Sequence, residues 1–404
     1  MSETRLAPDG SAQPLPVHPV ESPVPTRTAV VACFAVFFVT GATTASLGAG
    51  LPFFAAHFGL THGAGHVIAW YNLGALAAVA ALGAVGTRLS TGKAITAMLL
   101  LFGGGCAAMA AGPTWMLFCA AAVVAGSGYG GLGLILNTAF GRRFGANSVV
   151  MVNRLNAVFG IGAVAGPLAV GTLGRWSIQT LPLIAALLAL LCLPSRLLDR
   201  GPQQPTGATP GGSARNSTPV VWILLLCAIG FLYAGMETSI GAWESTQLTW
   251  SHWHTADAAR AVSGFWGGLV IGRLLLPAIT RRAGAATLLP AHLAVGAAFL
   301  ALSAVPGLTA GAYLLAGIAV APVLPTLIAW LLATVDQPQR WSSVLILGDM
   351  AANTAMPTAV GLAAGPAHPF LISIALAGVC TAGLAVAMVA RLKDRSRASA
   401  SKSH

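Results

Sequence analysis

Charged side chains are scarce in this sequence. Asp, Glu, Lys and Arg together make up 8% of its 404 residues, whereas a soluble globular domain carries about 25%. Hydrophobic residues make up 56% of the chain, and so apolar a chain cannot cover itself with charged surface. The composition therefore excludes an ordinary soluble domain and indicates an integral membrane protein.

Acidic residues are the rarer of the two charge types, and none lies between residues 28 and 198. A charged side chain at the centre of a bilayer costs roughly 2.5 to 3.5 kcal/mol on insertion scales, so those that occur there usually serve a function. The carboxylates within apolar segments are Glu237, Glu244 and Asp349. A carboxylate that carries a proton through the membrane region must therefore be one of these.

The sequence also lacks the motifs of several other protein classes. Its six cysteines lie in apolar segments without metal-like spacing, which argues against a disulfide framework and against a zinc site. It has no catalytic nucleophile pattern and no GxxxxGK phosphate loop. We therefore expect no enzymatic activity, no cofactor and no bound metal, and an ATP-driven pump would need a separate partner.

Long apolar runs make up most of the chain. Residues 1–27 are polar and rich in proline, without the apolar core of a signal peptide, and predict a disordered cytoplasmic tail. Apolar segments that suit membrane-spanning helices follow. They cover residues 28–56, 64–87, 94–112, 114–140, 149–173, 178–197, 219–245, 258–280, 285–304, 307–334, 341–364 and 369–391. The predicted fold class is an all-α membrane protein with twelve transmembrane helices in two six-helix halves.

A polar stretch rich in proline and glycine, residues 199–218, separates the two halves and predicts a flexible cytoplasmic linker. The halves then cover residues 28–198 and 219–392, and residues 393–404 form a cytoplasmic tail. The strings NRLNAVFGIGAVAGP and LGDMAANTAMPTAVG occupy matching places in the fifth and eleventh segments. Such a repeat is the plan of many secondary transporters, whose substrate site lies near the membrane midplane between the halves.

Lys and Arg are distributed unevenly among the loops. If the N-terminus is inside, the outer loops hold Arg175 and Arg260. The inner loops and tails hold Arg88, Lys93, Arg142, Arg143, Arg196, Arg200, Arg215, Arg281, Arg282, Arg340, Arg391, Lys393, Arg395, Arg397 and Lys402. This bias predicts a multi-pass protein of the cytoplasmic membrane with both termini in the cytoplasm. It also accounts for the net charge of +11, so the charge does not indicate a nucleic-acid partner.

The glycine-proline pattern GIGAVAGP in the fifth segment, together with the short basic turns after the second and eighth segments, resembles the major facilitator superfamily. More narrowly, GAGLPFFAAHFGLT (residues 48–61) and YAGMETSIGAW (residues 233–243) are similar to the fucose-permease-like branch. The resemblance implies a twelve-helix transporter in which Glu237 and Trp243 face the cavity.

We therefore predict a secondary active transporter, coupled to protons, that moves a small organic solute by alternating access. The solute would be sugar-like or another polar metabolite. Glu237 is the first candidate for the proton-coupling group, followed by Asp349 and Glu244, because a carboxylate in a low dielectric responds to which side of the membrane its cavity faces. Tyr233 lies one turn before Glu237 and could hydrogen-bond it. For Glu244, a solvated position at the outer mouth is an equal alternative.

Other residues are candidates for binding or gating. Those for substrate binding are Tyr233, Trp243, Asn156, Asn353, Asn72, Tyr71 and Trp266. Asparagines in membrane helices also bond to neighbouring helices, and aromatic residues also form interfacial belts, so both alternatives stay open. The candidates for gating are Arg154, Arg273, Pro322 and Pro325. Either arginine could pair with Asp349, and the prolines could form a hinge or a simple kink.

Three other functions compete with this interpretation. Sugar-proton symporters of the branch that the chain resembles tend to carry acids in the N-terminal half, which has none here. The alternative is thus a proton antiporter that exports a drug or secondary metabolite, with proton and cationic substrate binding alternately to the acids. A membrane enzyme is disfavoured by the lack of catalytic clusters, and a channel by the two-half repeat. The expected partners are a small-molecule substrate, protons and the lipid bilayer, with the protein as a monomer and no nucleic acid.

Overall fold

The computed structural model describes residues 26–85, 90–174, 177–199, 219–279 and 283–400. The predicted N-terminal tail and the predicted linker lie almost wholly outside these residues, and the basic residues Arg88, Arg175, Arg281, Arg282 and Lys402 lie outside them too. Within the described part of the chain the secondary structure is helix, without a strand.

Threonine side chains, Thr26 and Thr114, cap two helices of the first group. Each threonine hydroxyl accepts a backbone hydrogen bond in the first turn that follows it, at the starts of α1 and α5. The elements are α1 (Arg27–Ala49), α2 (Leu51–Phe58), α3 (His66–Val85), α4 (Thr91–Ala111), α5 (Trp115–Arg143), η2 (Gly145–Asn147), α6 (Ser148–Leu173), α7 (Thr180–Leu191) and η3 (Leu193–Asp199).

The second group of helices begins directly after Pro219, which has no N–H group to leave unsatisfied at a helix start. Its elements are α8 (Val220–Trp250), α9 (Thr255–Ile279), α10 (Ala285–Leu302), α11 (Thr309–Val320), α12 (Val323–Thr334), α13 (Pro338–Leu362) and α14 (Phe370–Ala400).

Eleven helical stretches in the described residues are long and apolar enough to cross a membrane. They coincide with eleven of the twelve predicted segments, and the remaining one, residues 341–364, is helix α13. Its 25 residues reach about 37 Å, more than a bilayer core requires. Its lower hydropathy comes from polar side chains such as Asp349 and Asn353. The predicted all-α fold of twelve membrane-crossing segments is confirmed.

Three of the predicted segments are divided between two helical elements, and one of them, residues 178–197, forms α7 and the short helix η3. Residues 28–56 form α1 and α2, which meet at Gly50. Residues 307–334 divide into α11 and α12 at Pro322, because a proline lacks the N–H group and its ring clashes with the preceding turn. Pro325 lies in the first turn of α12, where the missing N–H group is tolerated. Pro322, and not Pro325, therefore breaks this segment.

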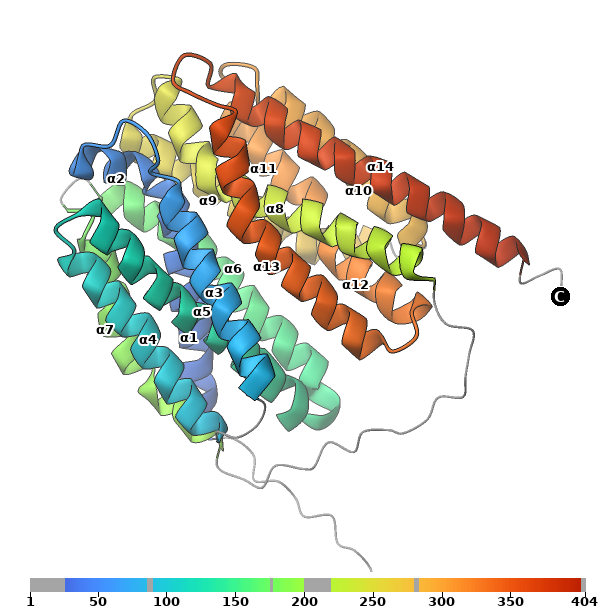
Figure 1. Cartoon of the computed structure of the whole chain (residues 1–404), viewed down its shortest axis with the longest axis horizontal. Coiled ribbons are helices and arrows are strands. Elements are labelled where there is room, and N and C mark those ends of the chain that lie inside the picture. The colour runs from blue at the N-terminus through green and yellow to red at the C-terminus, as the bar shows by residue number, and fades with distance from the viewer. Residues whose placement is uncertain (1–25, 86–89, 175–176, 200–218, 280–282, 401–404) are drawn as a thin grey trace, which may run out of the picture.

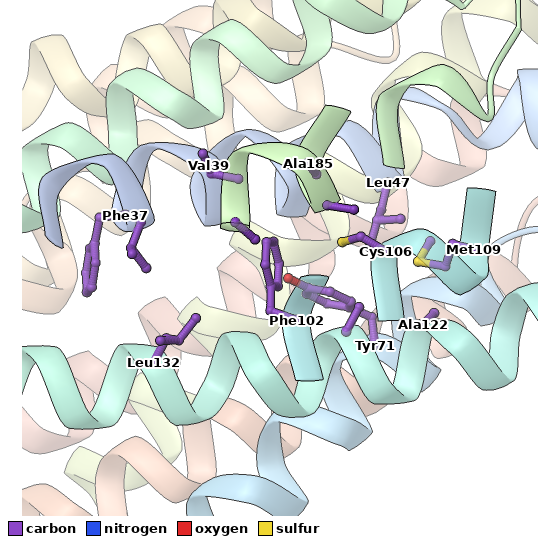
Figure 2. Close-up of a cluster of buried hydrophobic side chains, with 14 of the residues drawn as sticks. Phe37, Val39, Leu47, Tyr71, Phe102, Cys106, Met109, Ala122, Leu132 and Ala185 are labelled. Atoms are coloured by element: carbon purple, nitrogen blue, oxygen red, sulfur yellow. The ribbon is translucent and has the colours of Figure 1, made fainter. Parts of the chain in front are cut away.

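Two clusters of buried hydrophobic side chains hold the helices together. One comes mostly from α1 to α7 and the other from α8 to α14, matching the blue-to-green and yellow-to-red groups of ribbons in Figure 1. Figure 2 shows part of the first cluster, where Cys106 and Met109 of α4 lie close to Leu47 of α1 and Ala185 of α7. Each group of helices therefore has a core of its own.

The two groups contact each other toward the predicted outer end. There the hydroxyl of Ser245 in α8 donates to the carbonyl oxygen of Ala49 at the end of α1, at 3.0 Å. The hydroxyl of Ser263 in α9 donates to the carbonyl oxygen of Val164 in α6, at 2.8 Å. In addition, α3 packs against α13, and α6 packs against α9. These contacts close the outer end.

The opposite end, predicted to face the cytoplasm, is more open. Figure 1 shows the two groups of ribbons spreading apart with distance from α2. Asn153, Arg154 and Asn156, near the start of α6, are all exposed. Polar side chains in membrane helices usually face a bundle interior or a watery cavity, so we expect these three side chains to line the opening between the groups at this end.

Candidate functional site

An ion pair between two helices is the centre of the candidate site. Arg273 of α9 places its Nη2 atom 3.5 Å from Oε1 of Glu237 in α8, and the side chains are 37% and 16% exposed, respectively. A charge in this region is expensive unless it is paired or hydrated. The sequence suggested Arg273 as a partner for Asp349, but in this conformation its partner is Glu237.

Tyr233 lies one turn before Glu237 and is almost fully buried, at 1% exposure. Its hydroxyl interacts electrostatically with both members of the ion pair, but it forms no hydrogen bond of normal geometry. The interaction that the sequence suggested between Tyr233 and Glu237 is therefore present, but without the geometry of an ordinary hydrogen bond. A buried hydroxyl without a partner is costly, and it is ready to bond when the pair or a solute moves.

Asp349 brings a second carboxylate to the site from α13. It is 8% exposed, its Oδ1 atom is buried without a hydrogen-bond partner, and it interacts electrostatically with Glu237. Oδ1 rests against Gly230 of α8, where a Cβ atom would lie only 2.7 Å away. The site therefore contains two carboxylates, Glu237 and Asp349, and one arginine, Arg273.

The candidate asparagines bond largely to their own protein. Asn156 in α6 donates to the side-chain oxygen of Asn137 in α5 at 2.9 Å and also to the backbone of Val152. Asn353 in α13 accepts a hydrogen bond of 2.7 Å from Thr238 in α8. These two bonds join neighbouring helices, as the structural alternative for membrane asparagines predicts.

Asn72 and Tyr71 lie on α3, and both are buried. The amide nitrogen of Asn72 donates to the carbonyl oxygen of Ile68 in the preceding turn, at 3.0 Å. The hydroxyl of Tyr71 lies 3.3 Å from that of Thr44 in α1. Tyr71 therefore does not lie in an interfacial aromatic belt, because its hydroxyl group is held inside the first group of helices.

Tyr71 belongs to a series of rings that sequence reasoning did not find. Its ring stacks on Tyr129 of α5, with centroids 5.3 Å apart and planes 22° apart. Tyr129 stacks in turn on Phe159 of α6, at 6.3 Å and 27°. Tyr129 lies in the glycine-rich run GSGYGG, residues 126–131, a composition that by itself favours close packing of helices. A tyrosine among glycines was the one signal that could have identified it.

Trp243 and Trp266 lie between the two groups and pack against both hydrophobic clusters. The indole N–H of Trp243 donates to the carbonyl oxygen of Pro357 at 2.7 Å, and its ring lies so close to Gly65 and Gly361 that a Cβ atom on either would clash with it. Trp266 has a buried indole N–H without a partner. In this conformation Trp243 closes the outer end, whereas Trp266 keeps a free donor.

Glu244 is fully buried, at 0% exposure, and neither carboxylate oxygen has a hydrogen-bond partner. The alternative of a solvated carboxylate at the outer mouth is therefore wrong. The sequence placed Glu244 at the end of a helix, but α8 continues to Trp250 and other helices surround it. Nearby, the hydroxyl of Tyr313 donates to Gln247 at 2.5 Å, and Gln247 donates to Ser373 at 2.8 Å.

The remaining features of the structure lie away from these charges. Arg154 is exposed and forms no ion pair in the part of the chain that the structure describes. An apolar cavity of about 220 Å³ lies between α1, α4, α6 and α7 and has no charged residue in its lining. No cluster of His, Cys, Asp and Glu within the described ranges could hold a metal ion.

The sequence matches the model of the Major Facilitator Superfamily over residues 33–353. No curated protein sequence matches the chain. The family match covers both groups of helices and includes Glu237, Arg273 and Asp349.

Several solved transporter structures share the fold. A variant of the nucleoside transporter NupG has a TM-score of 0.72 at 15% identity, over 90% of this chain and 98% of its own. A variant of the peptide transporter POT in complex with alafosfalin has 0.75 at 12%, over 92% and 96%. A variant of the E. coli fucose:proton symporter FucP has 0.61 at 16%, over 89% and 98%. At these identities the likeness concerns the fold alone.

Proposed function

Because the chain belongs to the Major Facilitator Superfamily, it is a multi-pass membrane transporter, and we propose that it is a proton-coupled secondary transporter of a small organic solute. The observation that carries the proposal is the Glu237–Arg273 ion pair between α8 and α9, with Asp349 as a second buried carboxylate that rests against α8. Three ionisable groups among apolar helices serve a purpose other than stability. Transporters that bind near the midplane need such groups between their moving halves.

The ion pair suggests how a proton would act. Protonation of Glu237 removes its charge and frees the guanidinium of Arg273 to take another carboxylate, such as that of Asp349, the partner that the sequence suggested. Arg273 would then connect α9 to α13 in place of α8. Because the helices of a packed bundle have discrete arrangements, a change of partner of this kind biases one arrangement over another. A solute that bound only one of them would be coupled to the proton.

The conformation described here would be the inward-facing state of this cycle. The contacts at the predicted outer end and the exposed residues at the start of α6 support this assignment. We infer that the outward-facing state breaks the bonds from Ser245 to Ala49 and from Ser263 to Val164, and closes the inner end.

Substitution of Glu237 tests the proposal. Glu237→Gln keeps the shape of the side chain but removes its proton exchange. In proteoliposomes the variant should lose accumulation driven by a pH gradient, whereas counterflow of solute with the gradient collapsed should persist. Asp394→Asn is the matched control, because Asp394 lies near the end of α14, away from the site. The proposal fails if Glu237→Gln still concentrates solute as the wild type does.

A further inference from the structure

The apolar cavity between α1, α4, α6 and α7 lies inside the first group of helices, apart from the ion pair, and has a volume of about 220 Å³. Figure 2 labels five of the residues that line it, Val39, Leu47, Cys106, Met109 and Ala185. Apolar protein cavities of about 150 Å³ stay free of water and bind benzene or xenon. This cavity therefore has room for a benzene ring that carries a small substituent.

Polar groups are few in the cavity. Its lining has no charged side chain, and its two hydroxyl groups belong to Thr43 and Ser46 of α1. The hydroxyl of Thr43 donates to the carbonyl oxygen of Val39 at 2.8 Å. The hydroxyl of Ser46 lies beside Gly166 of α6, where a Cβ atom would be 2.8 Å away, and it forms no hydrogen bond within the described residues. One hydroxyl is thus left to bond with an occupant.

The single free hydroxyl of Ser46 selects the kind of occupant. A buried water molecule makes about three hydrogen bonds, and apolar walls beside one hydroxyl offer too few. A charged molecule would enter without a counter-ion, at a cost that apolar contacts do not offset. A neutral molecule with an apolar body and one polar group matches the walls and also gives Ser46 a partner.

Helix α7 lies between the cavity and the lipid. This helix packs mainly against α4 and only slightly against α6. Its side chains Leu183, Leu187 and Leu190 are about half exposed, and in a membrane they face lipid. Ile184 of the same helix lines the cavity and is exposed as well. We therefore expect a molecule dissolved in the lipid to enter between α6 and α7.

We propose that this cavity is a binding site for a small neutral phenol or alcohol with an apolar body, which enters from the lipid and forms a hydrogen bond with Ser46. The apolar body fills empty space with contacts to the four helices. The hydroxyl of the ligand supplies the partner that Ser46 lacks. The site is separate from the Glu237–Arg273 pair, so it is a site additional to the one proposed for transport.

Photo-crosslinking to the purified full-length protein in lipid nanodiscs tests the proposal. The label is 4-ethylphenol with a diazirine on its side chain, and peptide mass spectrometry locates the adducts. The competitors are 4-ethylphenol, ethylbenzene and 4-ethylbenzoate, which separate the hydroxyl group, the apolar body and a charge. They are compared at equal concentrations in the lipid.

We expect adducts on residues that line the cavity. 4-Ethylphenol should compete at a concentration about fivefold lower than ethylbenzene, the effect of one buried hydrogen bond, and 4-ethylbenzoate should not compete. The proposal is overturned if the adducts lie elsewhere, or if ethylbenzene or 4-ethylbenzoate competes as well as 4-ethylphenol.

Variants connect the label to the cavity. Ala185→Phe places a ring in the empty space and should abolish the competed labelling. Leu187→Phe is the matched control, since Leu187 lies on the same helix, is 55% exposed and does not line the cavity, and it should label as the wild type does. Labelling that persists in Ala185→Phe would refute the cavity as the site.

Ser46→Ala tests the hydrogen bond and keeps nearly the size of the side chain. In this variant 4-ethylphenol should lose its fivefold advantage, whereas competition by ethylbenzene should stay as in the wild type. An unchanged advantage would refute the role of Ser46. Neither substituted residue belongs to the ion pair, so the proposal and that of proton coupling can fail independently.

Discussion

The position of Asp349 depends on its neighbour Gly230, which has no side chain. Its Oδ1 atom rests where a Cβ atom of Gly230 would be, and it has no hydrogen bond to hold it elsewhere. The carboxylate therefore fits against the backbone of α8 because position 230 is glycine. This close fit also keeps Asp349 near enough to Glu237 for each to sense the charge of the other.

Gly230→Ala should displace the Asp349 carboxylate and impair transport. Alanine stabilises a helix by roughly 1 kcal/mol relative to glycine, so the variant should remain folded. We expect proton-driven transport to fall by roughly tenfold, which corresponds to about 1.4 kcal/mol in the limiting step. Gly378→Ala in α14, where a Cβ atom meets nothing within 4 Å, is the matched control. Equal transport rates in the two variants would contradict a role for this contact.

At the scale of helices, the closest approach between the two groups is that of α1 and α8. A Cβ atom on Gly48 would lie 1.9 Å from the carbonyl oxygen of Gly241, so the backbones of the two helices touch. The hydrogen bond from Ser245 to Ala49 lies beside this contact. In membranes such close approach supplies the packing energy that the hydrophobic effect supplies in water, so this contact keeps the outer end closed.

Gly48→Val should separate α1 from α8 and favour the outward-facing state. The added methyl groups clash with backbone, which cannot turn aside as a side chain can. A cysteine at position 245, where the native Ser245 is fully buried, should react several-fold faster with an impermeant thiol reagent in this variant than in the chain that keeps Gly48. Gly133→Val in α5, where a Cβ atom meets open space, should leave the reaction rate unchanged. Equal labelling with and without the Gly48→Val substitution would rule out the α1–α8 contact as a gate.

At the scale of the whole molecule, each group of helices has its own buried core, and the two meet mainly at one end. Two separately packed bodies can move against each other without breaking either core. This arrangement suits alternating access better than a single continuous core would. The orientation of the bundle in the membrane decides from which side of the membrane a solute would enter the open end.

Labelling of the linker tests that orientation. Single cysteines placed between residues 200 and 218 should react with an impermeant reagent only from the cytoplasmic side, because the positive-inside rule places this segment there. Intact cells and inside-out vesicles provide the two conditions. The native cysteines, which are mostly buried, set the background in the parent protein. Labelling in intact cells would reverse the predicted topology.

The amino-acid sequence determined the fold class and the identity of the ionisable groups. Long apolar segments, with few charges among them, leave helices as the way to satisfy every backbone polar group in lipid. The same scarcity made Glu237, Glu244 and Asp349 conspicuous, because an acid within such a segment is costly. The break of the tenth segment at Pro322 also has a local cause, the missing N–H group of proline.

Tertiary structure decided which of these groups act together. The sequence made Arg273 a candidate partner for Asp349, but the packing of α8 against α9 pairs it with Glu237. Glu244 looked like a residue at a helix end and is instead sealed among helices. The stacked rings of Tyr71, Tyr129 and Phe159 come from three different helices. Periodicity along one helix gives the direction of a side chain, but its partner depends on how distant helices pack, and no local pattern records that.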